Sequence, residues 1–198
     1  MTNSPNWVNY NLQLGQSKPG LVDAGIASTA GTTNSPAGTA FPSVPVGTIS
    51  QFRDIGTTQL GNGTFIYLPG VTATVAGDVV VYRTPDGSGL SPDVNAGAVT
   101  IRWTGTANTG FPLAIATAAV NTQSQWGWYQ IQGSAIVNVS GTVAAGDKVF
   151  FAQVATWGTT VAGGKQVLGA QANSANNLPT TGKAVYTLNN PVVQSQIT

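Results

Sequence analysis

The stretch from Trp126 to Gly133 reads WGWYQIQG and places three aromatic rings within four positions of a chain that has five tryptophans. In a β-strand successive side chains point to opposite faces, so Trp126 and Trp128 share one face while Tyr129 and Ile131 share the other. We predict that this stretch is a strand whose Tyr129 and Ile131 face the core and whose Trp126 and Trp128 form an outer stripe. Because the strand divides its rings between two faces, it cannot offer all three to one ligand.

Three interpretations of the stripe formed by Trp126 and Trp128 are open. Tryptophan is among the strongest anchors of protein interfaces, so the stripe suits a contact with another subunit. Its flat, amphipathic rings also suit stacking against a sugar. The third interpretation is ordinary packing beneath a loop of the same chain.

The chain from residue 46 onward predicts a protein built of strands. Short segments rich in valine, isoleucine, threonine and aromatic residues recur between glycine, proline, asparagine and aspartate, which is the pattern of strands joined by turns. The 25 glycines and 11 prolines leave little room for helices, and glutamate is absent. The predicted fold class is all-β, an antiparallel sandwich or a small barrel. We predict strands at 64–68, 78–83, 99–104, 112–118, 128–132, 135–139, 147–155, 166–170 and 184–188.

Two segments of this predicted domain echo each other. Residues 65–82 and 128–152 both run from an aromatic strand through a glycine to an apolar strand, and then through Ala-Gly-Asp to a second apolar strand. Glycine tolerates a positive φ and aspartate can bond to the backbone close by, so the Gly-Asp pairs that end at Asp78 and Asp147 predict turns. We interpret the echo as a hairpin unit that occurs twice.

Residues 1–45 differ in composition from the rest of the chain. Between Gly15 and Pro45 they are mainly glycine, serine, threonine, alanine, asparagine and proline, a composition that buries too little to fold alone. We therefore predict an extended N-terminal arm and linker at 1–45 and an all-β domain at 46–198. The arm begins with an alternating apolar stretch that predicts one strand, made of Trp7, Val8, Tyr10, Leu12 and Leu14.

Two roles are open for this arm strand. A linker of about 30 flexible residues has the reach to pair the strand with something beyond its own domain. Alternatively, the strand closes an edge of its own sheet. The predicted partner-binding residues are those of the arm strand together with Trp126 and Trp128.

The charge content of the chain restricts its partners. Charged residues make up 7% of the chain, against about 25% in ordinary globular proteins, and seven lysines and arginines are spread along it against six aspartates. No basic cluster is present to neutralise a run of phosphates, so we expect no nucleic-acid partner. No apolar run is long enough to span a membrane and the start lacks the pattern of a secretory signal, so we expect no membrane partner and no cleaved export signal.

The inventory of residues disfavours catalysis. The chain contains no histidine, no cysteine and no glutamate, which excludes a Ser-His-Asp triad, a histidine-ligated metal and thiolate chemistry. A glycosidase needs two carboxylates about 5 to 9.5 Å apart. However, four of the six aspartates stand beside glycine or proline, as turn residues do. We expect a protein that is not an enzyme and that carries no metal and no cofactor. The four aspartates are Asp78, Asp86, Asp93 and Asp147.

Six segments follow one another in a characteristic order. They are GTFIYLPG at 63–70, GDVVVYR at 77–83, WGWYQIQGSAIV at 126–137, AGDKVFFA at 145–152, VLGAQA at 167–172 and AVYTLNNPVV at 184–193. Together they resemble the decoration proteins, also called cement proteins, of tailed-bacteriophage heads. The resemblance covers residues 46–193 and leaves the arm unmatched.

The resemblance implies a small, mostly β structural protein of the virion, commonly a homotrimer, on the outer surface of the capsid. It implies that the chain binds the major capsid protein, bridges neighbouring capsid subunits and stabilises the shell against internal DNA pressure. The neutral surface and the tethered arm strand agree with a part that is added to a preformed shell. The alternative is a carbohydrate-binding β module, such as a head fibre or adhesin, which requires Trp126 and Trp128 to face solvent.

Overall fold

A computed structural model describes residues 5–8, 18–24, 26–27, 40–83, 99–175 and 179–195. These residues form strands, turns and connecting segments and contain no α-helix. None of the residues so described forms a helix that is long and apolar enough to cross a membrane. The predicted all-β fold class is confirmed, and the paired strands run antiparallel.

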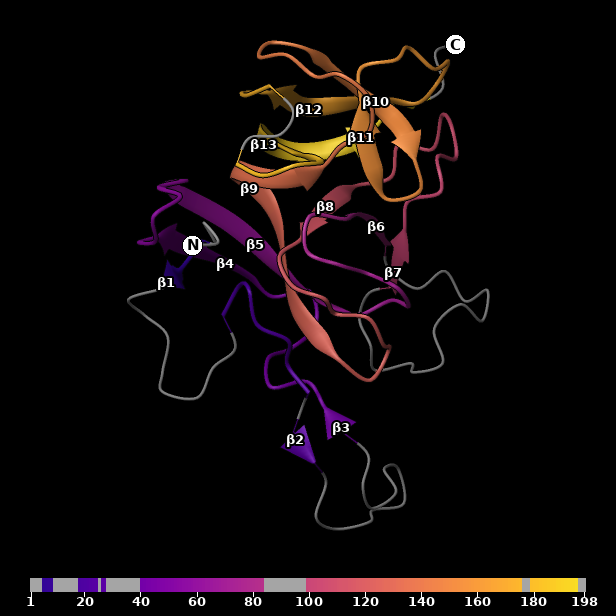
Figure 1. Cartoon of the computed structure of the whole chain (residues 1–198). Coiled ribbons are helices and arrows are strands. Elements are labelled where there is room, and N and C mark those ends of the chain that lie inside the picture. The colour runs from indigo at the N-terminus through magenta and orange to yellow at the C-terminus, as the bar shows by residue number, and fades with distance from the viewer. Residues whose placement is uncertain are drawn as a thin grey trace.

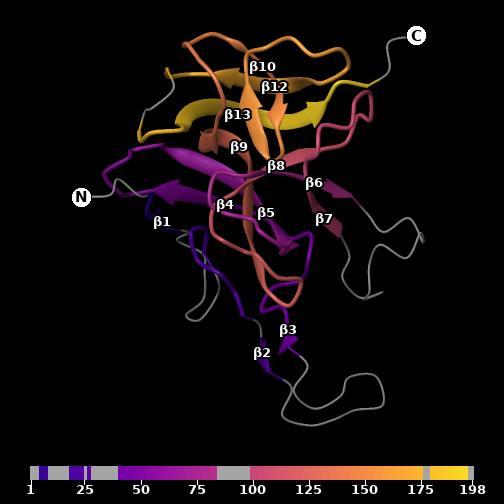
Figure 2. The same ribbon diagram turned by 45° about the vertical axis from the view of Figure 1, so that its right-hand side comes forward.

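Eleven strands form one large sheet and two short strands form a second. Along the large sheet the order is β1-β4-β5-β9-β13-β12-β10-β11, while β8 also pairs with β9, and β6 pairs with both β8 and β7 (Figure 1). The two-stranded sheet β2-β3 lies at the lower end of the molecule in Figures 1 and 2. The bounds are β1 Trp7–Val8, β2 Ile26–Ala27, β3 Ala40–Phe41, β4 Ile49–Asp54, β5 Asn62–Pro69, β6 Val79–Arg83, β7 Val99–Arg102, β8 Leu113–Ala116, β9 Trp126–Asn138, β10 Lys148–Gln153, β11 Thr156–Gly158, β12 Gln166–Ala172 and β13 Lys183–Val193.

The longest strand, β9, belongs to both halves of the large sheet. One of its edges pairs with β5 from Trp126 to Gly133, and the other edge pairs with β8 and then with β13 from Gln132 to Asn138. Gly133 has a φ of 93°, a conformation that glycine adopts at no steric cost, and the register with β5 shifts just before it. The strands predicted at 128–132 and 135–139 are therefore one continuous strand with an irregularity near Gly133.

Apolar side chains fill three clusters around β9. Tyr129 and Ile131 pack in one cluster with residues of β5, β6 and β8. Trp126 and Trp128 pack in another, with residues of β1, β4 and β5. The third and largest cluster lies among the C-terminal strands. The predicted alternation of the WGWYQIQG stretch is confirmed, because its two sets of rings enter different clusters.

The C-terminal strands curl back toward β9. Val139, just after β9, forms a parallel bridge with Trp157 of β11, and the Ser140 N–H donates to the Trp157 carbonyl at 2.9 Å. The Trp157 ring is buried inside this curl and meets the Tyr186 ring edge-on, with their centroids 5.1 Å apart. The contact is a single bridge and not a ladder, so the sheet is strongly curved but open.

The two predicted Ala-Gly-Asp turns have the same hydrogen bonds. In the first, the Val75 N–H donates to the Asp78 carboxylate at 3.1 Å and the Asp78 N–H donates to the Val75 carbonyl at 3.1 Å. In the second, the Ala144 N–H donates to the Asp147 carboxylate at 2.7 Å and the Asp147 N–H donates to the Ala144 carbonyl at 3.2 Å. The intervening glycine has a φ of 96° in the first turn and 89° in the second, so both turn predictions are confirmed.

The interpretation of the echo as a hairpin is wrong. The strands that flank each turn, β5 and β6 or β9 and β10, pair with other strands and not with each other. After its turn β6 pairs with β7 and β8, and in the same way β10 pairs with β11 and β12. An equivalent backbone hydrogen bond closes each unit. The Gly77 N–H donates to the Ala116 carbonyl in the first, and the Gly146 N–H donates to the Ala172 carbonyl in the second, both at 2.8 Å. The repeated unit therefore has four strands. Strands β5–β8 form the first copy, and strands β9–β12 repeat its connectivity.

The described N-terminal residues pack against the domain. Strand β1 pairs with β4, with Trp7 opposite Asp54 and Val8 opposite Arg53. Trp7 is 2% exposed and shares a core cluster with Val44 and with residues of β5 and β9. Packing therefore crosses the predicted boundary between residues 45 and 46. Two roles were open for the arm strand, and Trp7 and Val8 take the second of them, because they close an edge of their own sheet.

Substitution of Gly133 by alanine should strongly destabilise the fold. A Cβ at this position would lie 2.4 Å from the Asn62 carbonyl oxygen, in addition to the strain of the positive φ. We expect a loss of about 3 kcal/mol or more in the free energy of unfolding, measured by urea denaturation. Gly141 is the matched control because its φ is 83° and nothing lies within 4 Å of its added Cβ. Its change to alanine should cost about 1 kcal/mol; equal losses at both sites would contradict the close approach of β5 and β9.

Candidate functional site

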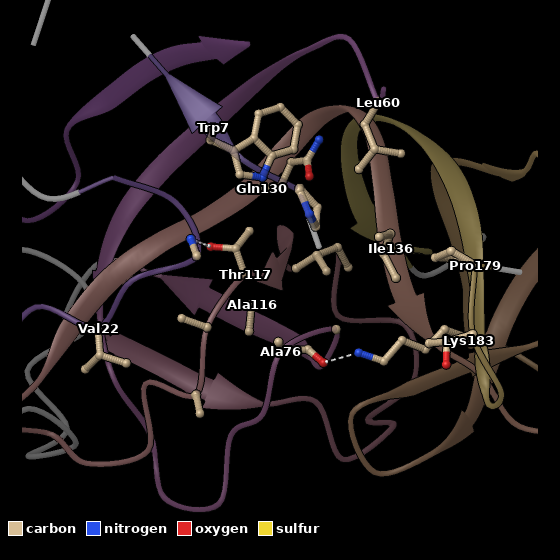
Figure 3. Close-up of a pocket in the computed structure, with 17 residues that line it drawn as sticks. Trp7, Val22, Leu60, Ala76, Ala116, Thr117, Gln130, Ile136, Pro179 and Lys183 are labelled. Carbon is tan, nitrogen blue, oxygen red and sulfur yellow. Dashed lines mark hydrogen bonds between the residues drawn. The ribbon is translucent and has the colours of Figure 1, made fainter. Parts of the chain in front are cut away.

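A pocket of about 700 Å³ opens between the N-terminal residues and the large sheet (Figure 3). Its walls come from β1, from residues 18–24, from β8 and the loop after it, from β9 and from the start of β13. Most of the lining side chains are apolar or small, among them Trp7, Val22, Leu60 and Ile136. A pocket of this volume that is mainly apolar and carries a few polar groups is typical of ligand-binding sites.

Lys183, the first residue of β13, supplies the charge among the described residues that line the pocket. Its Nζ donates to the Ala76 carbonyl at 3.0 Å, the bond drawn at the lower right of Figure 3. Burial lowers the pKa of the Lys183 ammonium, and the nearby Asp78 carboxylate offsets part of that effect. An ammonium has three N–H donors, so the bond to Ala76 leaves donors for a ligand.

Gln130 supplies a buried amide to the same pocket. The residue is 2% exposed, and its Nε2 donates to the carbonyls of Gln132 at 3.1 Å and Ser134 at 2.9 Å. These bonds use both N–H groups of the amide and fix its orientation, because both partners are carbonyl oxygens. The Oε1 atom is then the group of Gln130 that is left to accept a hydrogen bond, and Gln130, like Trp7, lines the pocket (Figure 3).

An ion pair lies close to Lys183. The Arg102 guanidinium approaches one carboxylate oxygen of Asp78 with Nη2 at 3.0 Å and Nε at 3.2 Å. Asn138 donates to the other oxygen at 2.9 Å. Asp78 is 2% exposed, so these partners are needed to compensate the burial of its charge. Since Arg102 balances Asp78, the Lys183 ammonium leaves this group with one positive charge in excess.

A second carboxylate, Asp23, fastens residues 18–24 to the sheet. Its Oδ2 accepts hydrogen bonds from the hydroxyls of Tyr67 and Ser43 and from the Ser43 N–H. The backbone of Asp23 exchanges two hydrogen bonds of 2.8 Å with Trp126. Burial, together with Asp23, raises the pKa of the Tyr67 hydroxyl far above its usual value, so Tyr67 remains a donor. These bonds hold one wall of the pocket in place.

A third carboxylate, Asp54, organises the loop between β4 and β5. It accepts hydrogen bonds from the N–H groups of Asn6 and Gly56 at 2.8 Å and of Leu60 at 3.0 Å, and from the Thr58 hydroxyl. Burial by itself favours the protonated form, but these bonds outweigh it and hold the pKa of Asp54 below its usual value. The bond to Asn6 ties β1 to the sheet, and β1 contributes Trp7 to the pocket.

Trp126 and Trp128 do not form the predicted outer stripe. Trp126 is 8% exposed and Trp128 is 2% exposed. The Trp128 ring meets Phe52 and Tyr67 edge-on, with centroids 5.0 and 5.3 Å away. The stripe prediction is wrong because side chains of the same chain cover this face of β5 and β9: Phe52 of β4, and Trp7 and Val44 from the N-terminal residues, share a cluster with both tryptophans. Packing within the chain, the third of the interpretations open from the sequence, describes both tryptophans.

The remaining predicted partner-binding residues divide into two sets. Trp7 and Val8 lie in β1, and Trp7 is buried in the core while Val8 is partly buried. Tyr10, Leu12 and Leu14 lie outside the described residues. The structure therefore brings Trp7, Trp126 and Trp128 into one apolar cluster, and of these three the pocket is lined by Trp7.

Sequence reasoning missed Lys183 and Gln130 as site residues. Each is one of several polar residues in its strand, so nothing local marks it, and the contact of Lys183 with Ala76 joins positions 107 residues apart in the chain. In the part of the chain that the structure describes, no three carboxylate, histidine or cysteine side chains lie together as ligands for a metal. The pocket is thus suited to holding a ligand through one ammonium, one amide oxygen and apolar walls.

Comparison of the chain with family models, with curated proteins and with solved structures gave no match.

Substitution of Trp128 by alanine should destabilise the fold by about 3 to 5 kcal/mol, because it removes a buried aromatic side chain and leaves a cavity. Denaturation in urea, followed by circular dichroism, measures the change. Gln123 is exposed in the loop before β9, and its change to alanine should stay within about 0.5 kcal/mol. A Trp128→Ala protein as stable as the control would show that the ring lies in solvent, as the stripe prediction required.

Substitution of Asp54 by asparagine should lower stability at neutral pH by roughly 2 to 3 kcal/mol, because the charged acceptor of the β4–β5 loop is lost. The folded-state pKa of Asp54 lies below its unfolded value of 3.8, so its contribution is complete above that pH and declines as pH falls through the folded-state pKa. Urea denaturation of both proteins from neutral pH downward should therefore show the difference narrowing below about pH 4. A difference that is independent of pH would contradict this role of the carboxylate.

Proposed function

We propose that this chain is a structural virion protein of the capsid-decoration type, which binds the outer surface of a phage head and bridges its major capsid subunits. The observation that carries the proposal is the character of the surface. Charged residues make up only 7% of the chain, and large apolar side chains are exposed on several described elements. They are Leu21, Val22, Ile49, Ile55, Val75, Val154, Val161 and Leu168.

Such a surface suits a protein that spends its life in an assembly. Low charge gives little repulsion between molecules, and exposed apolar side chains lower their free energy when another protein covers them. Val161 is the most exposed of the set at 79%, and it lies in the loop between β11 and β12. The resemblance of residues 46–193 to head decoration proteins agrees with this interpretation and directs it to the shell of a virion.

The carbohydrate-binding alternative has less support. A sugar platform at Trp126 and Trp128 requires their rings to face solvent, whereas both are buried by the packing of β1 and β4. Trp103 and Trp157 are also buried. No described tryptophan therefore presents a free ring face of the kind on which a sugar stacks.

The proposed mechanism is mechanical. A rigid β body with apolar contacts at more than one place on its surface can join subunits that would otherwise separate. A homotrimer placed on neighbouring capsid subunits would gain affinity from several modest contacts made at once, and would raise the stability of the shell in the same way. Within this proposal, Tyr10, Leu12 and Leu14 are the candidates for anchoring to the capsid or to a sibling subunit, while Trp7 and Val8 complete the fold.

A binding experiment with whole particles tests the proposal. Phage heads prepared without this protein should take it up on their outer surface, visible by electron microscopy, and should then resist heating better than bare heads. Replacing Tyr10, Leu12 and Leu14 together by serine should lower occupancy, and the melting temperature of the free variant serves as the control that it is folded. Binding to a glycan array in the absence of any binding to heads would support the carbohydrate-binding alternative instead.

A further inference from the structure

The pocket beside Lys183 has an apolar interior with two polar groups at its walls, one a hydrogen-bond acceptor and the other a charged donor. At one side is the Oε1 of Gln130, an acceptor on a side chain that is 2% exposed and whose N–H groups are already used. At another is the Lys183 ammonium, which has donors beyond the one directed to Ala76. Figure 3 shows Gln130 and Lys183 at different places around the pocket, with Ile136 between them in this view.

The charge balance at Lys183 selects an anionic partner. Asp78 lies close enough to influence the Lys183 ammonium but is already paired with Arg102 at 3.0 Å. Among the described residues that line the pocket no carboxylate is present to neutralise Lys183. A phosphate group carries up to two negative charges and is usually held by several donors or by an arginine fork, whereas one carboxylate balances the single charge of one ammonium.

The remaining features select a peptide. A main-chain N–H is the donor that suits the Gln130 Oε1, and an apolar side chain suits walls made of Val22, Leu60 and Ile136. We infer that the pocket binds an extended peptide segment of a partner protein, with an acidic group on Lys183, an apolar side chain against the walls and a main-chain N–H on Gln130. The inference rests on the proposed function in one respect, since the partner would then be the capsid subunit.

Peptide binding by the full-length protein tests the inference without capsids. The probe is an acetylated peptide of about six residues, a length suited to a pocket of this size, made of alanine and leucine with a C-terminal aspartate. The comparison peptide has asparagine and a terminal amide in place of the acidic groups. In a titration followed by NMR of the labelled protein, the acidic peptide should shift the signals of Lys183, Gln130 and Ala76. It should bind about tenfold more tightly than the neutral peptide, the factor that one ion pair of moderate strength provides.

Two variants separate the pocket from the overall charge of the protein. Lys183→Gln should abolish the preference for the acidic peptide, while Lys148→Gln, which removes an exposed lysine of β10, should preserve it. Melting temperatures of both variants establish that they are folded. Equal binding of the two peptides to the wild-type protein, shifts confined to other parts of the molecule, or the absence of any binding would each overturn the inference.

Uptake by capsids distinguishes this inference from the proposed function. If Lys183→Gln protein binds phage heads as well as wild type does, the decoration role stands but the pocket is not its contact. If the wild-type protein fails to bind heads yet prefers the acidic peptide through Lys183, the pocket is a peptide site for a different partner. A loss of head binding with Lys183→Gln and not with Lys148→Gln would support both.

Discussion

The geometry of the molecule depends on a strand that is hydrogen-bonded along both edges to different partners. Gln132 and Gly133 of β9 face β5 on one side and β13 on the other, so the backbones of three strands meet at this point. Gly63 and Gly133 are opposite each other there, and a Cβ on Gly133 would collide with the Asn62 carbonyl. The absence of a side chain is thus what lets two halves of the sheet share one strand.

The pocket follows from this arrangement. Since β9 passes from one half of the sheet to the other, it carries Gln130 and Ile136 to the same cavity from positions on either side of Gly133. The first Ala-Gly-Asp turn brings Ala76 to the start of β13, where Lys183 bonds to it. Three carboxylates then fix the surroundings: Asp54 holds β1, Asp23 holds residues 18–24, and Asp78 holds Arg102 and Asn138. Each of them serves to position a wall, and Lys183 is left as the charge that faces the ligand space.

The sequence predicted the features that local chemistry determines. Alternation divided the rings of the WGWYQIQG stretch correctly, and the Gly-Asp pairs predicted both turns, because each depends on neighbours along the chain. It did not predict what covers Trp128, since both Phe52 and Trp7 lie far away in sequence: Phe52 meets the ring from β4, and Trp7 joins the cluster through the pairing of β1 with β4. Strand β4 itself was not predicted, because Phe52 is its one buried apolar side chain and the others are polar or exposed. Gln130 and Lys183 became a site through contacts between distant strands, which no local pattern signals.

The position of β9 in the middle of the sheet also affects how the chain reaches its folded state. β5 and β8 precede β9 and can pair with it as soon as β9 is made, but the part of β9 from Gln132 to Asn138 lacks its partner on the other edge until β13 is available. Pairing between segments so far apart makes folding slow, and during that interval an apolar strand with free N–H and C=O groups is a template for pairing with another copy. Production of this protein should therefore be sensitive to the rate of synthesis and to temperature, with aggregates formed through β9 before β13 has closed its edge.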